Sequence, residues 1–138
     1  MGVNLFTEDE RGARLAELLD PHGFVGCIVA LAGHEKTVCL RFVDPYGDTL
    51  FNQLQIPVLI RELEAARDLI TDERVAELGQ EKLESARKAG WAPMVIQSIE
   101  SSNRTLTATD IRAHLERVLN LARRTQGKAH TYLKFYGD

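Results

Sequence analysis

The residues best suited to bind a ligand or to catalyse a reaction lie around a phrase that the sequence uses twice. Tyr-Gly-Asp occurs at 46–48 and again at 136–138, each time after a basic residue and an aromatic. The repeat predicts that two strand ends lie close together in one sheet. It matches no known catalytic motif, so the chemistry has to be judged from the residue types around it.

A set of basic and aromatic residues is predicted to share one open face of that sheet. Side chains alternate between the two faces of a strand, which places the apolar residues of 37–43 and 131–136 under the helices. The opposite face would then present Arg41, Tyr132, Lys134 and Tyr136. Aromatics beside cations are typical of a surface that contacts a protein partner, a second copy of the chain or a stacked base. A solvated sheet face with Tyr–Lys pairs gives the same pattern.

Oxygen-bearing side chains form an alternative site at the same strand ends. Its members are Asp44, Asp48, Asn52 and Asp138. Calcium and magnesium prefer such donors, and paired carboxylates serve in acid–base catalysis. The segment nevertheless lacks the ligand density and the final Glu of a known calcium loop. We therefore predict no metal and no cofactor, and Asp44 is equally well explained as the first residue of a type I turn.

The histidines do not form a recognisable site. His22, His34, His114 and His130 show no mutual spacing typical of metal ligands, and none completes a Ser/His/Asp or Cys/His pattern. The chain also lacks a phosphate-binding glycine loop, a dinucleotide fingerprint, zinc-ligand spacing and a nucleophile elbow. We therefore interpret all four histidines as structural or surface residues and predict no catalytic residue.

Length and charge restrict the class of protein. A chain of 138 residues is large enough for one domain with its own core, which we place over 1–138. Its net charge of −3 argues against general binding to nucleic acid or to an anionic membrane. Two cysteines in apolar runs, Cys27 and Cys39, indicate reduced core thiols, and no apolar run is long enough to span a membrane. With no signal peptide at the N-terminus, we expect a cytoplasmic protein.

The first half of the chain is predicted to hold one helix and three strands. Thr7 and Glu10 have the spacing of a capping box, which predicts a helix over 8–19. Apolar runs over 24–31 and 37–43 predict a hairpin, and a short strand over 48–51 completes a three-strand meander. Asp44-Pro45-Tyr46-Gly47 fits the turn before that last strand.

The second half is predicted to be mainly helical. Apolar residues at helical spacing predict helices over 55–70, 71–89 and 108–125, and a last strand follows at 131–136. Residues 91–100 fit either a strand or a short helix from Pro93, and 101–104 is expected to be a loop. Runs of strands and helices, without strict alternation, indicate the α+β class. We predict a small antiparallel sheet, the meander plus the C-terminal strand, with helices packed on one face.

Two segments resemble a group of small uncharacterised bacterial proteins. Asp44-Pro45-Tyr46-Gly47-Asp48-Thr49-Leu50-Phe51-Asn52 is similar to the Asp-Pro-Tyr-Gly-Asp-Thr-x-Phe-Asn phrase that these proteins carry. The resemblance extends to 132–138 and to the start of the helix predicted over 55–70, and it leaves 71–108 unmatched. It implies a bacterial soluble domain and carries no function.

These observations favour a non-enzymatic bacterial interaction protein of the accessory or immunity type. Its contact surface would be the aromatic and basic sheet face, used for a protein partner or for a homodimer. The alternative is a small-ligand binder or hydrolase-like enzyme that uses the acidic residues at the Tyr-Gly-Asp strand ends. A third possibility is single-stranded nucleic acid on the sheet, and the net negative charge argues against it.

Overall fold

The computed structural model describes residues 2–137. Its helices and strands run in the order β1 (Val3–Asp9), β2 (Arg14–Leu18), α1 (Phe24–Ala32), β3 (Asp48–Phe51), α2 (Ile56–Arg67), α3 (Asp72–Lys88), α4 (Pro93–Thr105), α5 (Ala108–Thr125) and β4 (Thr131–Gly137). Short 3-10 turns at His34–Lys36 and Leu40–Phe42 lie between α1 and β3. No helix within 2–137 combines the length and the apolar character that crossing a membrane requires.

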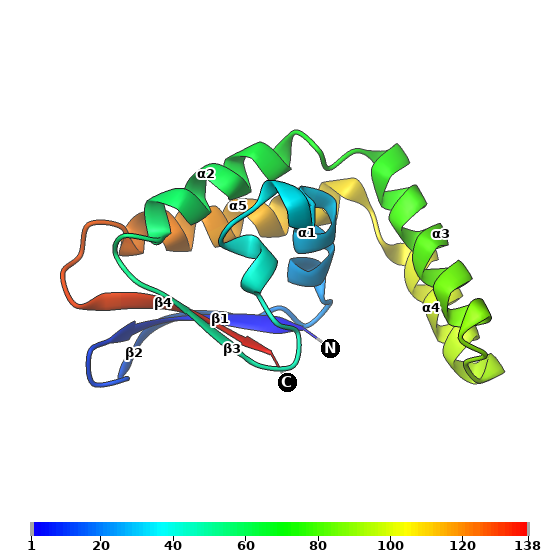
Figure 1. The fold of residues 1–138 in the computed structure, drawn as a ribbon, viewed down its shortest axis with the longest axis horizontal. Coiled ribbons are helices and arrows are strands. Elements are labelled where there is room, and N and C mark those ends of the chain that lie inside the picture. The colour runs from blue at the N-terminus through cyan, green and yellow to red at the C-terminus, as the bar shows by residue number, and fades with distance from the viewer. Residues whose placement is uncertain (1, 138) are drawn as a thin grey trace.

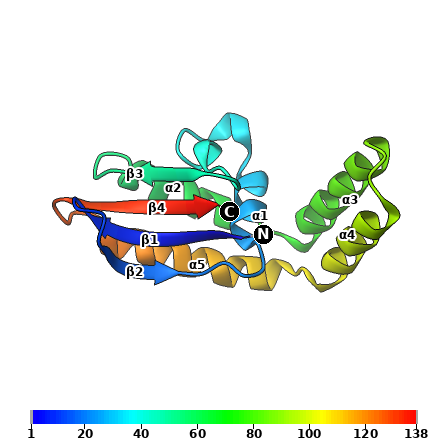
Figure 2. The same ribbon diagram turned by 90° about the horizontal axis from the view of Figure 1, so that it is seen from below.

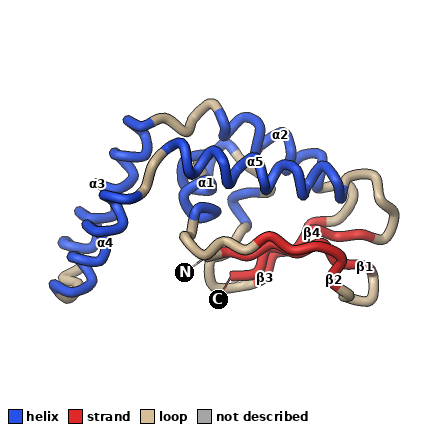
Figure 3. The backbone as a smooth tube through the Cα atoms, turned by 180° about the vertical axis from the view of Figure 1, so that it is seen from behind, coloured by secondary structure: helices blue, strands red, loops and turns tan. Residues whose placement is uncertain are grey.

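The strands form one antiparallel sheet with helices on a single face. Across residues 2–137 the strand order is β2-β1-β4-β3, and every neighbouring pair is antiparallel. Helices α1, α2 and α5 form a layer above this sheet, and the other face is left without helices (Figures 1 and 3). The predicted α+β class, with an antiparallel sheet covered on one side, is confirmed.

The core lies between the sheet and helix α5. Leu5 of β1 and Leu133 and Phe135 of β4 point into it and are almost completely buried. From above, α5 contributes an apolar stripe that includes Ile111 and Leu115. The helix begins where the sequence indicates, because the Thr107 side chain accepts a hydrogen bond from the Asp110 amide. The helices predicted over 55–70, 71–89 and 108–125 and the strand over 131–136 all agree with the structure.

The helix predicted over 8–19 is wrong, because this segment belongs to the hairpin of β1 and β2. The Asp9 carboxylate accepts hydrogen bonds from the amides of Arg11 and Ala13, and Gly12 takes a positive φ of 79°. These features form a tight turn, for which Asp and Gly are favoured. The capping-box spacing of Thr7 and Glu10 therefore coincides with a strand and has no capping role.

The hairpin predicted over 24–31 and 37–43 is also wrong. The first run forms helix α1, and the second contains the 3-10 turn at Leu40–Phe42. Helix α1 is hydrophobic on most sides because it packs against α2, α3 and α5. A short apolar run of this kind fits a buried helix as well as a buried strand. The sheet therefore takes its first two strands from residues 3–18, and the meander does not form.

Helices α3 and α4 form an arm that projects from the rest of the molecule, which we call the body. The two helices lie side by side as an antiparallel pair beyond the end of the sheet (Figures 1 and 2). The undecided residues 91–100 lie mainly in helix α4, and the loop expected at 101–104 is a continuation of the same helix. Pro93 starts α4 from a position where its missing N–H costs nothing.

Candidate functional site

Three of the four residues predicted for the sheet face lie on the uncovered side of the sheet. Tyr132, Lys134 and Tyr136 alternate on β4 with the buried residues Leu133 and Phe135. In the register, Lys134 lies between Phe6 of β1 and Leu50 of β3. The row beside it places Tyr136 between Asn4 and Asp48. We call this surface the outer face.

Contacts within the outer face already satisfy most of its charges. The Lys134 ammonium lies 3.3 Å from Asp48 and 4.0 Å from Glu8. The Arg14 guanidinium lies 3.7 Å from the centre of the Phe6 ring, which keeps that ring buried although it points away from the core. Leu50 and Tyr136 keep exposed fractions of 53% and 38%. The solvent-exposed side chains of the outer face are therefore more aromatic and apolar than basic.

Arg41 does not belong to the outer face. It lies in the 3-10 turn at Leu40–Phe42, with its guanidinium 5.3 Å from the Phe42 ring centre. The prediction depended on a strand over 37–43, and that strand does not exist. Arg14 of β2 is the arginine that the outer face contains, and the sequence could reveal it only once residues 14–18 were recognised as a strand.

The two Tyr-Gly-Asp copies do meet, as the repeat predicts. The Gly137 amide donates a hydrogen bond of 2.9 Å to the Gly47 carbonyl oxygen. A Cβ added to Gly137 would lie only 2.4 Å from the Asp44 carbonyl oxygen and 2.4 Å from the Pro45 carbonyl carbon. Glycine is therefore required where β4 passes over the turn that precedes β3. The repeat serves this close backbone contact.

The acidic residues of the alternative site are engaged in local structure. The Asp44 carboxylate accepts a hydrogen bond from the Tyr46 amide, and the Asn52 side chain accepts from the amides of Leu54 and Gln55. Asp48 pairs with Lys134. Asp138 lies outside the described residues. Within 2–137, no group of three or more His, Cys, Asp or Glu side chains is arranged to hold a metal ion.

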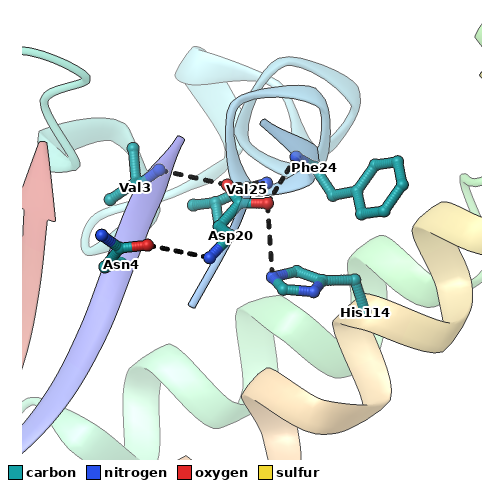
Figure 4. A network of polar contacts seen from close by, with 6 residues as sticks. All are labelled: Val3, Asn4, Asp20, Phe24, Val25 and His114. Carbon is teal, nitrogen blue, oxygen red and sulfur yellow. Dashed lines mark hydrogen bonds and ion pairs between the residues drawn. The ribbon is translucent and has the colours of Figure 1, made fainter. Parts of the chain in front are cut away.

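The most connected polar group is one that the sequence analysis missed, and it centres on Asp20. This carboxylate is completely buried and accepts hydrogen bonds from the amides of Val3, Phe24 and Val25 at 2.8–3.1 Å. The Asp20 amide in turn donates to the Asn4 side chain (Figure 4). The carboxylate therefore caps helix α1 and ties it to β1, where the favourable helix dipole adds to the hydrogen bonds.

His114 of α5 completes this group from above. Its Nε2 lies 3.6 Å from a carboxylate oxygen of Asp20, too far for a hydrogen bond, and finds no hydrogen-bond partner among the described residues (Figure 4). Burial lowers the pKa of His114 below its ordinary value of 6.5. Asp20 opposes this effect, whereas Arg117 and His22 add to the lowering. His114 is therefore neutral at pH 7, and the Asp–His pair is a buried structural contact.

A groove of about 610 Å³ opens beside this group, in the angle between the body and the arm. Its walls come from the loop before α1, from the end of α4 and from α5. The Phe24 ring lies between the rings of His22 and His114, with centroid distances of 5.4 and 5.6 Å. Arg117 lines the groove and forms no ion pair within residues 2–137.

Glu62 of α2, whose side chain is half-buried, forms a second anchor that the sequence analysis did not identify. Its carboxylate accepts hydrogen bonds from the successive amides of Val38, Cys39 and Leu40. These bonds hold the segment that was predicted as a strand. Cys39 and Cys27 are free, buried thiols, as predicted, and burial raises the pKa of both.

Comparisons of the chain with protein-family models, with curated proteins and with solved structures found no match.

Proposed function

We propose that this chain is a non-enzymatic protein-interaction domain, of the accessory or immunity type, and that its outer face binds a protein partner. The observation that supports the proposal is a sheet covered by helices on one face only, with Leu50 and Tyr136 exposed on the other. An exposed aromatic next to an exposed apolar side chain, on a surface where the lysine and the arginine already have partners, is typical of protein contacts.

The internal ion pairs indicate the chemistry of this partner. Because Glu8 and Asp48 neutralise Lys134, the outer face offers no free cluster of cations to a phosphate backbone. The partner is therefore a protein that supplies apolar side chains to Leu50 and Tyr136. Single-stranded nucleic acid fits this surface less well.

The enzyme alternative has less support. Asp44 accepts a hydrogen bond from a backbone amide and Asp48 is paired with a lysine, so neither carboxylate is left as a free acid or base. Asn52 carries an amide, which has no acid–base role, and it too holds a backbone amide. A general acid or base needs an accessible proton-transfer position beside substrate. The resemblance to small bacterial proteins remains the basis for proposing a bacterial protein, and the two free cysteines support a cytoplasmic setting.

Site-specific photo-cross-linking in the source cells tests the proposal. A photoreactive amino acid at Leu50 should produce a discrete adduct with another protein, and the variant Tyr136→Asp should abolish it. The matched control is the same amino acid at Ala65, which is exposed on α2 in the helix layer. Equal adducts from both positions, or none from Leu50, would contradict a contact surface on the outer face.

A further inference from the structure

Helix α4 of the arm has one face without a partner in the chain. Its other face packs against α3, where the Asn103 amide donates to the Gly79 carbonyl oxygen and Glu100 pairs with Arg87 at 3.2 Å. Even so, within the described residues no side chain of α4 is buried. A helix of 13 residues is marginally stable in water unless packing supports it.

The open face of α4 carries an uncharged stripe. Val95, Ser98, Ser102 and Thr105 follow one another at spacings of three or four residues, which places them on one side of the helix. All four are exposed. Small side chains at the middle of such a stripe allow another helix to approach closely.

The two ends of this stripe differ in a complementary way. At the tip of the arm, Trp91 and Met94 have exposed fractions of 53% and 81%. At the base, Ser102 and Thr105 form part of the wall of the 610 Å³ groove. One end of the stripe therefore presents exposed apolar side chains, and the other end opens into a hollow.

We propose that two copies of the chain associate through this stripe, with their α4 helices antiparallel about a two-fold axis. A two-fold contact uses the same patch on both copies, so each patch must be complementary to itself. The antiparallel arrangement sets Ser98 of one copy against Ser102 of the other. It also brings the tip of each arm to the groove of the other copy.

The groove suits an aromatic side chain from the tip. Phe24 and Leu106 provide apolar wall, and Asp110 and the exposed Arg117 add one charge of each sign. Arg117 forms no ion pair within residues 2–137. An arginine attracts the face of a tryptophan ring, the strongest such partner among the aromatics. Trp91 of one copy would therefore bind beside Arg117 of the other, and the contact would form twice.

These features favour a second copy of the chain as the partner, because each copy presents an exposed apolar tip at one end of the stripe and a groove at the other. Val95 and Thr105, the first and last residues of the stripe, are ten residues and so about 15 Å apart along α4, and Trp91 lies beyond Val95 at the tip. The antiparallel partner presents its own groove and tip at the same separation. The outer face of the sheet takes no part in this contact and stays free for the proposed partner.

Sedimentation velocity, from micromolar to millimolar chain concentration, is the first test. The native chain should shift towards twice the mass of one chain as concentration rises. Ser98→Arg should raise the dissociation constant of the dimer at least about tenfold, because it places a charge in the centre of the contact. The matched control is Gln97→Arg, which adds the same charge to an exposed position on another side of α4 and should leave the dimer unchanged. A native chain that stays monomeric throughout, or equal effects of the two variants, would overturn the proposal.

Cross-linking tests the antiparallel register, with circular dichroism to confirm that each variant is folded. A short bismaleimide should link Val95→Cys chains to Thr105→Cys chains when the two are mixed, and should link neither variant to itself. The native thiols are buried and should not react. Preferential linking of Val95→Cys to itself would indicate a parallel pair and overturn the arrangement. The photo-cross-linked adducts from Leu50 should persist in Ser98→Arg, because the outer face takes no part in the dimer. Loss of the dimer and loss of the partner on the outer face can therefore be told apart.

Discussion

Helices α5 and α4 follow one another in the chain and are stabilised in different ways. The 18 residues of α5 include nine buried side chains, and the helix lies along the sheet. The 13 residues of α4 include no buried side chain within the described chain, and its only helical neighbour in the arm is α3. Both helices are amphipathic, so amphipathic sequence alone does not show whether a helix is covered by its own chain.

The same contrast appears in how the helices begin. In the body, α1 is capped by the buried carboxylate of Asp20, which also binds strand β1. In the arm, α3 is capped by Thr71, whose exposed hydroxyl accepts only from the Arg74 amide. The body therefore joins its elements through buried polar contacts, whereas the arm uses local ones. Equivalent substitutions should therefore lower the free energy of unfolding far more in the body than in the arm.

The largest difference is expected between the two caps. Asp20→Ala leaves two buried amides and one half-buried amide without an acceptor, and should lower the free energy of unfolding by about 3–5 kcal/mol. Thr71→Ala removes one exposed bond and should cost about 1 kcal/mol. Urea denaturation followed by circular dichroism measures both values. Equal costs would show that Asp20 does not anchor the body.

A smaller difference is expected between two isoleucines on the neighbouring helices. Ile111 of α5 is completely buried, so Ile111→Ala should cost about 3 kcal/mol through lost burial and the cavity that remains. Ile99 of α4 is only partly buried, and Ile99→Ala should cost about 1 kcal/mol or less. The measurement should be made at low concentration, where the proposed dimer is absent. A larger cost for Ile99→Ala would reverse the comparison.

Glu62 should have an intermediate effect within the body. Glu62→Gln keeps one acceptor oxygen for the amides of 38–40 and removes the charge, so we expect a loss of about 1–2 kcal/mol. Thermal unfolding should show a lower midpoint. Amides 38–40 should exchange faster with solvent, while those of the arm should be unchanged. Faster exchange throughout the chain would instead indicate a global role for Glu62.

The smallest expected effect is a dependence on pH in the body. Because burial lowers the pKa of His114 below 6.5, the unfolded chain binds a proton at a pH where the folded chain does not. This contribution to stability is complete above about pH 6.5 and is lost as the pH falls below that value. The free energy of unfolding, measured by denaturation at several pH values between 5 and 8, should depend less on pH in His114→Gln than in the native chain. An unchanged dependence would contradict a neutral, buried His114.

Patterns with a local physical cause could be predicted from the sequence. The repeat of Tyr-Gly-Asp correctly indicated two adjoining strand ends, and Thr107 with its apolar stripe correctly located α5. Pro93 offered the right start for α4, although the length of that helix was not foreseen. These features depend on turn geometry, capping and periodicity, which act over a few residues.

Features that depend on distant residues could not be predicted. The apolar run 24–31 became a helix because several helices surround it, and no local signal separates that outcome from a strand. Asp20 looked like the end of a helix, whereas its carboxylate binds amides on both sides of it along the chain. Arg41 was assigned to the sheet face through a strand that does not form. Errors in the candidate site therefore followed from errors in strand assignment.

Hydrogen exchange at two chain concentrations tests the account most directly, because it compares α4 with α5 in the same sample. We predict that the amides of α4 become more protected as concentration rises, while those of α5 stay equally protected at both concentrations. That result would mean that the arm completes its packing with a second copy and that the body does not need one. Protection of α4 that is independent of concentration would contradict the account.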